Sequence, residues 1–504
     1  MKQTTSLHAP AAVVRTQAAR SRRSAAHPAL GSALTILLLV ACPAVLAQPV
    51  DTAPAPVEPD KSLPDKSVAD KSLAIPVVEI VAFDFLLNAY NRRFSKTTDY
   101  DVTWGSIRRN LRGPWVVDND PFKVNQFAHP IQGSLYHGAG RASGLGYWES
   151  SALTFAGSMW WEITGEKTQP SRNDQIASGI GGSFLGEPLF RMARLVTDRS
   201  DLPASYRNWI AAGISPAVGF NRMMYGSRFD SAFVDNDPAY YGRMHVGATH
   251  VAQHDFNSAA NFKRNMLQID FALDYGLPGK TGYNSTRPFD YFSAQVLFSS
   301  ANGIENLSTR GLLYGTDYGF GDNYRGIWGL YANYDYLSPQ IFHVSTTSLS
   351  LGTTAQWLGF KDYALQGTVL AGLGYAAAST ARSVNAGVSN DSEYHYGTAT
   401  RAAVALRAIK GDRAALDVSA RMVSLGNITR RSAGRDEIYR VDTAFTWRIQ
   451  GPHGVGINYL WSHRSASYQG IDGSRQSLGT AGIYYTLLGQ QGFGEVDWRP
   501  RPAN

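Results

Sequence analysis

The second half of the chain alternates apolar and polar residues with a period of two. One such run has Leu267, Ile269, Phe271, Leu273 and Tyr275 on one parity and Gln268, Asp270, Ala272 and Asp274 on the other. In a β-strand the two parities point to opposite faces of the sheet. Segments of this kind recur up to the C-terminus, near residues 241–251, 265–275, 289–299, 308–320, 325–337, 341–357, 362–375, 394–409, 414–425, 436–449, 455–467 and 476–488. The pattern predicts twelve antiparallel strands, each with one apolar and one polar face.

Strands of this kind are typical of a β-barrel that crosses a lipid bilayer. Aromatic residues make up 12% of the chain and charged residues 17%, which suits a membrane barrel and suits a disordered chain poorly. The alternative is a soluble β-sandwich or lipocalin-like barrel, which would bury the apolar parity. We expect an α+β, mainly β fold with a C-terminal antiparallel transmembrane barrel of about twelve strands over residues 201–490, followed by a tail over 491–504. Residues 209–224 could add a pair of strands and bring the number to fourteen.

The N-terminus has the pattern of an export signal. A basic stretch precedes an apolar run and a small-residue cleavage site, so residues 1–47 are predicted to be a signal peptide cleaved after Ala47. The alternative is a lipoprotein in which Cys42, the only cysteine, becomes the lipidated first residue. Residues 48–75 are rich in proline and repeat the triplet Asp-Lys-Ser, so we expect a disordered linker. The predicted location is the outer membrane of a Gram-negative bacterium.

The formal net charge of +7 does not indicate a nucleic-acid partner. Five of the basic residues precede residue 48 without any acid among them, so the mature chain would be nearly neutral. Beyond that segment no run of 18 or more apolar residues occurs, which argues against a membrane-spanning helix. The partners that we expect are outer-membrane lipids and the barrel-assembly machinery, with other envelope proteins as a further option.

Residues 76–200 are predicted to form a helical domain, because their apolar residues do not alternate. Ser171, which follows Pro170, is a favourable helix start. Gly182 and Gly186 lie four residues apart and would give one helix a smooth face for close packing. The lumen of a twelve-stranded barrel is too narrow for several helices. We therefore expect the helical domain at the periplasmic mouth of the barrel or against the inner leaflet of the membrane, outside the pore.

The helical segment contains an ordered set of short motifs. They are Trp115-x-x-Asp118-x-Asp120, His129-Pro130, Trp148-Glu149-Ser150, Trp161-Glu162, Pro170-Ser171-x-Asn173-Asp174 and Gly181-Gly182-x-x-x-Gly186-Glu187. In this order they resemble the bacterial envelope family known as domain of unknown function 3943. The resemblance implies a signal-bearing envelope protein with a C-terminal barrel, and it implies no activity.

The candidate catalytic residues lie in these motifs: His129, Glu149, Glu162, Asp174 and Glu187. A poorly solvated carboxyl group can act as an acid or base near neutral pH, and a histidine with two or three carboxylates could hold a divalent metal. The structural alternative is that the acids cap helices or pair with Arg141, Arg172 and Arg191. The motifs His-Glu-x-x-His and Gly-x-Ser-x-Gly are both missing from the sequence, so neither zincin nor α/β-hydrolase chemistry has its usual marker.

We assign no cofactor and no metal site, although His250 and His254 would share one face of a strand and are weak metal candidates. Three functions remain open. The first is an outer-membrane barrel with a helical domain on its periplasmic side, acting as a narrow channel or an envelope structural component. The second is an envelope enzyme that modifies lipid or cell-wall material through His129 with Glu149 or Glu162. The third is an assembly or docking module for other envelope proteins.

Overall fold

The computed structural model describes most of the chain beyond the predicted linker. The described residues are 70–95, 97–118, 120–198, 201–230, 237–256, 263–360, 362–380, 394–426, 434–468, 471–489 and 492–499. The predicted signal peptide, its cleavage site after Ala47, Cys42 and residues 48–69 of the predicted linker lie outside these residues.

The C-terminal part is a closed antiparallel barrel in which every strand pairs with its sequence neighbours and β1 pairs with β12. The strands are β1 (Tyr240–Phe256), β2 (Asn265–Tyr275), β3 (Phe292–Ser299), β4 (Gly303–Phe320), β5 (Tyr324–Leu337), β6 (Phe342–Leu358), β7 (Tyr363–Thr380), β8 (His395–Lys410), β9 (Ala414–Gly426), β10 (Gly434–Gln450), β11 (His453–Tyr468) and β12 (Ile471–Leu488). The prediction of a twelve-stranded antiparallel barrel is confirmed, and each strand overlaps the segment predicted for it.

The barrel is preceded by helices, which we call the helical unit. They are α2 (Ala74–Phe94), α3 (Trp104–Asn110), the π-helix η1 (Val124–Ala128), α4 (His129–Ala142), α5 (Tyr147–Thr164), α6 (Arg172–Asp174), the π-helix η2 (Gln175–Gly181), α7 (Gly182–Thr197), α8 (Ala204–Ile214) and α9 (Pro216–Tyr225). The unit is longer than expected at both ends. At its start, Asp70 and Lys71 of the predicted linker form ion pairs with Arg228 and Glu149.

The expected start of the barrel at residue 201 and the optional strand pair at 209–224 are both wrong. These residues form α8 and α9, and the first strand begins at Tyr240. Ala211 and Ile214 of α8, and Val218 and Asn221 of α9, are buried. Within each helix the two residues lie three apart, which is the spacing of a helix face and not that of a strand.

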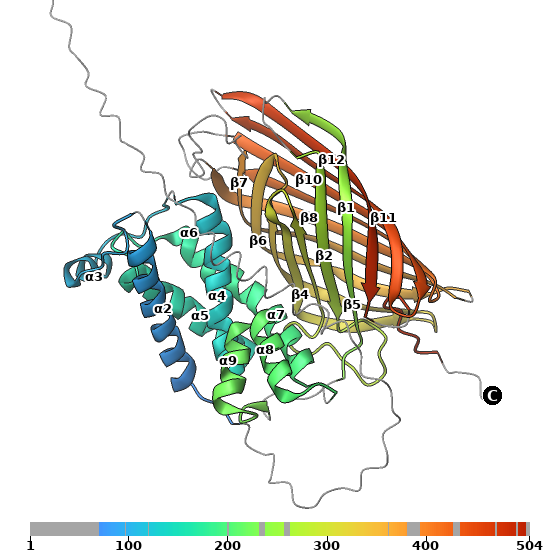
Figure 1. The fold of residues 1–504 in the computed structure, drawn as a ribbon, viewed down its shortest axis with the longest axis horizontal. Helices are drawn as coiled ribbons and strands as arrows, with labels where there is room; N and C mark the ends of the chain where they lie inside the picture. Colours follow the sequence, from blue (N-terminus) through green and yellow to red (C-terminus); the bar gives the residue numbers. More distant parts are fainter. Residues whose placement is uncertain are drawn as a thin grey trace, which may run out of the picture.

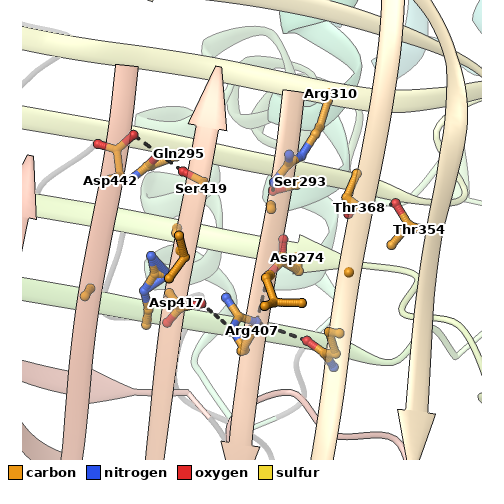
Figure 2. A pocket seen from close by; sticks show the side chains of 18 of the residues that line it. Asp274, Ser293, Gln295, Arg310, Thr354, Thr368, Arg407, Asp417, Ser419 and Asp442 are labelled. Atoms are coloured by element: carbon orange, nitrogen blue, oxygen red, sulfur yellow. Dashed lines mark hydrogen bonds and ion pairs between the residues drawn. The ribbon is translucent and has the colours of Figure 1, made fainter. Parts of the chain in front are cut away.

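The polar parity of the strands lines the lumen, as predicted, and its charges pair across the barrel. Arg407 of β8 lies 3.0 Å from Asp274 of β2, and Arg440 of β10 lies 3.6 Å from Glu305 of β4. Neither of these pairs joins neighbouring strands. Figure 2 shows Arg407 between Asp274 and Asp417 at the edge of a lumenal cavity of about 140 Å³. Side chains therefore occupy much of the space between opposite walls.

The C-terminal tail closes one end of the lumen. Phe493 is buried among lumen-facing residues that include Tyr241 and Leu358. Gln366, on the inner face of β7, donates a hydrogen bond to the carbonyl of Gly494, and Arg448 donates one of 2.7 Å to the carbonyl of Gly492. The tail lies at the barrel end where β12 finishes, the end at which β1 begins.

The helical unit packs beside the barrel, against the outer face of β2 to β6 (Figure 1). One apolar cluster joins Leu185 and Phe190 of α7 to Phe271, Leu273 and other outward-facing residues of the barrel. The hydroxyl of Thr309 donates a hydrogen bond to the carbonyl of Phe184, also on this outer face. The helical unit lies outside the pore, as expected, but it lies against the side of the barrel and not at its mouth. The outward apolar residues of these strands form the surface on which the helices pack.

Glycines allow α4 and α7 to approach closely, as the spacing of Gly182 and Gly186 predicts. A Cβ atom added at Gly182 would lie 2.5 Å from the Cα of Gly133, and one added at Gly186 would lie 2.8 Å from the Cβ of His137. Both distances are too short for a side chain. The two helices therefore pack backbone against backbone, which brings polar side chains on α4 close to those on α7.

Candidate functional site

Three of the predicted site residues meet at one end of the helical unit, and we call them the His–Glu–Asp cluster. His129 is the first residue of α4, Glu162 lies in the last turn of α5, and Asp174 ends α6. Their exposed fractions are only 4%, 3% and 2%. One nitrogen or oxygen atom from each lies within 4.8 Å of the other two. The fold thus gathers a histidine and two carboxylates from three separate helices.

The backbone around the cluster is held in place by a cap and by irregular helical turns. The hydroxyl of Ser171 accepts a hydrogen bond of 3.2 Å from the backbone N–H of Asp174, which is an N-cap. The backbone N–H of Ser171 donates one of 2.8 Å to a carboxylate oxygen of Glu162. The π-helix η1 leads directly into His129, and η2 follows directly after Asp174. Such π-helical turns are frequent at functional sites.

The side chains of the cluster have well-defined polar partners. His129 Nδ1 lies 3.1 Å from the hydroxyl of Ser178, and His129 Nε2 lies 3.5 Å from Asp174 Oδ2. The amide of Asn173 donates a hydrogen bond of 3.2 Å to Asp174 Oδ1. Each of the three residues therefore has one polar atom held by a neighbour.

Three further acids surround the cluster: Asp118, Asp120 and Glu166. Asp118 accepts hydrogen bonds from the side-chain amides of Asn125 and Asn173, at 2.6 and 2.7 Å. Burial raises the pKa of Glu166 to about 8 and the pKa of Asp120 to about 7, and neighbouring carboxylates add to both shifts. Burial also raises the pKa of Asp174 well above its ordinary value, again with help from nearby acids.

These acids have no basic partner in the part of the chain that the structure describes. None of Asp118, Asp120, Glu162, Glu166 and Asp174 forms an ion pair with a described lysine or arginine. Carboxylates buried together without positive charge are costly when ionised. The site therefore needs either bound protons or a cation.

Glu187 lies in a different environment, although it also contacts a histidine. Its carboxylate lies 3.0 Å from His137 Nε2, 2.8 Å from Arg141 Nε and 2.9 Å from Arg191 Nε. Arg191 also lies 3.2 Å from Asp290, in the segment between β2 and β3. Both arginines thus neutralise Glu187, and the network connects α4 and α7 to the barrel. This is the arrangement of a structural ion-pair network.

Glu149 is not near the cluster. Its carboxylate accepts a hydrogen bond of 2.6 Å from the backbone N–H of Gly146 and lies 3.1 Å from Lys71 Nζ, on the surface. It caps the start of α5. The structure therefore separates Glu149 from His129, whereas it brings Glu162 into the same cluster as His129.

His250 and His254 do not share a face of β1. The register against β12 shifts between Val251 and Gln253, so the strand has a β-bulge at this point. His250 pairs with Ala481 and His254 with Leu478, an odd offset that places the two imidazoles on opposite faces. His250 Nδ1 instead lies 2.6 Å from the side-chain oxygen of Asn265. The weak metal candidate is wrong because the bulge breaks the period of two.

Sequence reasoning missed Ser178 and Tyr394. Ser178 follows Asp174 by four residues, so helical spacing alone could have placed the two on one face. Tyr394, next to the start of β8, accepts a hydrogen bond of 2.8 Å from Asn125 and so brings the barrel to the edge of the site. No local pattern could have linked two residues so far apart in the chain.

Comparisons with known proteins found one family model that matches part of the chain and several solved structures of low similarity. No curated protein matches the chain. Among solved structures it is similar to the outer membrane channel DcaP of Acinetobacter baumannii, with 11% identity, 50% of this chain and 97% of that chain covered, and a TM-score of 0.21. It is also similar to OmpT of Vibrio cholerae, with 9% identity, coverage of 50% and 97%, and a TM-score of 0.18. A third similar structure is the translocator domain of the autotransporter NalP from Neisseria meningitidis, with 15% identity, coverage of 49% and 87%, and a TM-score of 0.20. Residues 114–217 match the family model described as Domain of unknown function (DUF3943), which confirms the resemblance carried by the motifs of this segment.

Proposed function

We propose that this protein is an integral component of the outer membrane in which a closed barrel holds the helical unit against its lipid-facing wall. In this proposal the protein is an envelope structural component, and its helical unit shares the lipid phase with the barrel. The observation that carries the proposal is the position of the helical unit on the outward, apolar parity of β2 to β6. A domain attached there must lie beside the barrel in whatever medium surrounds the barrel.

The uncovered part of the barrel wall supports a lipid environment. Outward-facing residues on the strands away from the helical unit are large, apolar and 40 to 70% exposed, among them Phe445, Trp447, Ile457 and Ile483. A band of apolar side chains around the outside of a barrel is the surface that contacts acyl chains. Polar and charged residues on the opposite parity face the lumen.

The outer surface of the helical unit also carries exposed, large apolar side chains. Val78, Phe85 and Leu86 of α2 are 65 to 72% exposed, and Trp160 of α5 is 46% exposed. Among the described helices, α2 is long and apolar enough, by length and composition alone, to cross a membrane. Two acids interrupt its apolar run, but both face inward. Glu79 accepts hydrogen bonds from Asn221, and Asp84 accepts one from Tyr136.

The interior of the barrel favours a structural role over a channel. Ion pairs join opposite walls, and the C-terminal tail closes the end where β12 finishes. A pore that conducts solutes needs open, water-filled space, and these side chains occupy part of the lumen.

Lipid contact can be measured with single labels. Cys42 precedes the predicted cleavage site, so a mature chain would carry no other thiol than an introduced cysteine. We expect fluorophores at Phe85→Cys and Phe445→Cys, in the full protein reconstituted into vesicles, to be quenched by lipids with nitroxide-labelled acyl chains. Asp412→Cys, in the exposed turn between β8 and β9 at one end of the barrel, is the control outside the apolar wall. Quenching at Phe445→Cys alone would place the helical unit outside the lipid. Quenching at neither exposed site would contradict the membrane location itself.

A second function, an envelope enzyme that acts on lipid or cell-wall material, is favoured by one observation. His129 and Glu162, which the sequence paired as base and partner, do lie in one buried cluster. Lipid profiles of cells that carry His129→Ala in place of the natural protein test it. Unchanged lipids and cell wall, with the variant protein present at normal levels, would exclude this activity.

A further inference from the structure

We propose that His129, Glu162 and Asp174 bind a divalent transition-metal ion of the zinc type between α4, α5 and α6. The site goes beyond the structural role proposed above and does not depend on the location of the protein. It rests on the distances between the three side chains, on the partners of each and on the charge around them.

The separation of His129 Nε2 and Asp174 Oδ2 fits two ligands of one ion better than it fits a hydrogen bond. Two donors that each lie about 2.1 Å from a tetrahedral ion are about 3.4 Å apart. The observed distance is 3.5 Å. A charge-assisted hydrogen bond between such groups is about 2.7–2.9 Å long. Glu162 joins them, because one possible ligand atom from each of His129, Glu162 and Asp174 lies within 4.8 Å of the other two.

Each of the three side chains is oriented as a metal ligand by a neighbour. Metal-binding histidines use one ring nitrogen as the ligand and place the other on a hydrogen-bonding partner. His129 has this arrangement, because Nδ1 lies on the hydroxyl of Ser178 while Nε2 points at Asp174. Asp174 Oδ1 accepts from Asn173, which leaves Oδ2 towards the cluster. Glu162 is likewise held through one oxygen, by the backbone of Ser171.

Within the described ranges, the His–Glu–Asp cluster lacks the positive charge that neutralises the buried carboxylate of Glu187. Glu187 has two arginines against its carboxylate. Glu162 and Asp174 have none among the described residues, and three more acids stand around them. A divalent cation would supply the positive charge that arginine supplies at Glu187.

The type of ion follows from the ligand set. Magnesium and calcium prefer sites made of oxygen alone, whereas imidazole suits zinc, iron and other transition metals. Catalytic zinc sites use three protein ligands and leave a fourth position open, and His129, Glu162 and Asp174 supply that number of ligands. We therefore expect zinc to bind and magnesium not to compete.

The test uses the mature, untagged full chain in detergent, stripped with a chelator and then dialysed against zinc. We expect about one zinc ion per chain by elemental analysis and a rise in the thermal midpoint that excess magnesium does not reproduce. Glu162→Gln and Asp174→Asn keep the shape of the side chains and should weaken zinc binding at least tenfold. Glu187→Gln, a buried acid outside the cluster, should keep the stoichiometry even if it lowers stability. Binding that Glu162→Gln and Glu187→Gln reduce equally, or a chain that retains no zinc, would overturn the proposal.

X-ray absorption on the zinc-loaded natural protein gives an answer that does not depend on how any variant folds. The expected spectrum has only nitrogen and oxygen donors at about 2.0–2.2 Å and the outer-shell scattering of a single imidazole. A spectrum without imidazole, or one with several imidazoles, would show that zinc binds elsewhere, since the chain has other histidines, and would refute this site.

Discussion

At the scale of single residues, the two histidines of α4 illustrate how neighbours decide a role. His137 and His129 are both buried and both face a carboxylate. His137 shares its carboxylate with two arginines and so belongs to a network that is already neutral. His129 faces carboxylates without such partners. A histidine beside a carboxylate therefore stabilises helix packing at His137 and forms part of a candidate ligand set at His129.

Glu187→Gln should destabilise the helical unit strongly. The change keeps the shape but leaves Arg141 and Arg191 buried with less negative charge, and breaking a buried pair of this kind costs about 3–5 kcal/mol. Unfolding in denaturant, followed by tryptophan fluorescence, measures the loss. Glu149→Gln is the matched control, because that carboxylate is on the surface. Equal stability of the two variants would show that the buried network contributes nothing.

Gly182→Ala should also destabilise the protein, through steric overlap alone. The added methyl group would lie 2.5 Å from the backbone of Gly133, so α4 and α7 would have to separate. Overpacking of this kind costs about 1–3 kcal/mol or more. Gly105→Ala in α3, where the nearest atom would be 3.6 Å away, should be neutral or stabilising in the same denaturation assay. A stable Gly182→Ala variant would contradict the close packing.

The sequence identified the candidate site residues but could not show which of them lie together. The dipeptide Trp-Glu occurs twice, at Glu149 and at Glu162, and the local pattern gives no reason to prefer either. The two are 13 residues apart on one helix, which at 3.6 residues per turn rotates them by about 220°. Only one of them can therefore face the interior. Which one does depends on how α5 lies against α4, and no local motif contains that information.

At the scale of elements, the strands were predictable because their chemistry repeats at the period of their geometry. The strand pair expected at 209–224 is wrong because this stretch forms two short helices, and periodicity over so few residues does not distinguish a helix from a strand. The bulge in β1 was not visible either, since it leaves the residue types unchanged and shifts only the pairing partner.

Removing the C-terminal tail should open one end of the barrel. Phe493 and its neighbours fill the lumen where β12 finishes, and no strand depends on them for pairing. We expect a chain ending at residue 489 to show more leakage in planar bilayers than the natural protein, although the ion pairs between opposite walls remain in both. The leakage of the Phe493→Ala variant should lie between that of the natural protein and that of the truncated chain. Steady conductance of the natural protein, unchanged by truncation, would mean that the tail does not seal the lumen.

At the scale of the whole molecule, the position of the helical unit could not be read from the sequence. The apolar parity of a strand looks the same whether lipid or a helix covers it. Leu267 and Leu273 lie on the same face of β2, yet Leu267 is 68% exposed and Leu273 is fully buried under the helical unit. The pattern therefore predicts which face of each strand is apolar. It does not predict whether lipid or the helical unit covers that face.

The stability of the metal-free molecule should depend on pH through the acids around the His–Glu–Asp cluster. The pKa of Glu166 is raised from 4.5 to about 8 and that of Asp120 from 3.8 to about 7, in both cases mainly by burial. Between these values the folded chain keeps protons that the unfolded chain has lost. Folding is therefore favoured at the acidic end of the window, and stability falls as pH rises from about 5 to about 8.

Other acids of the protein titrate too, so the informative quantity is a difference between two chains. The comparison is between the chelator-treated natural protein and the double variant Asp120→Asn, Glu166→Gln. We expect the difference between their thermal midpoints to change with pH. Between pH 5 and pH 8 the thermal midpoint of the natural protein should fall relative to that of the variant. The amides of the variant cannot ionise, so they avoid the cost of burying charge. Parallel curves for the two proteins would show that these carboxyl groups are solvated or already paired in the folded molecule. That result would also remove the charge argument for a cation at this end of the helical unit.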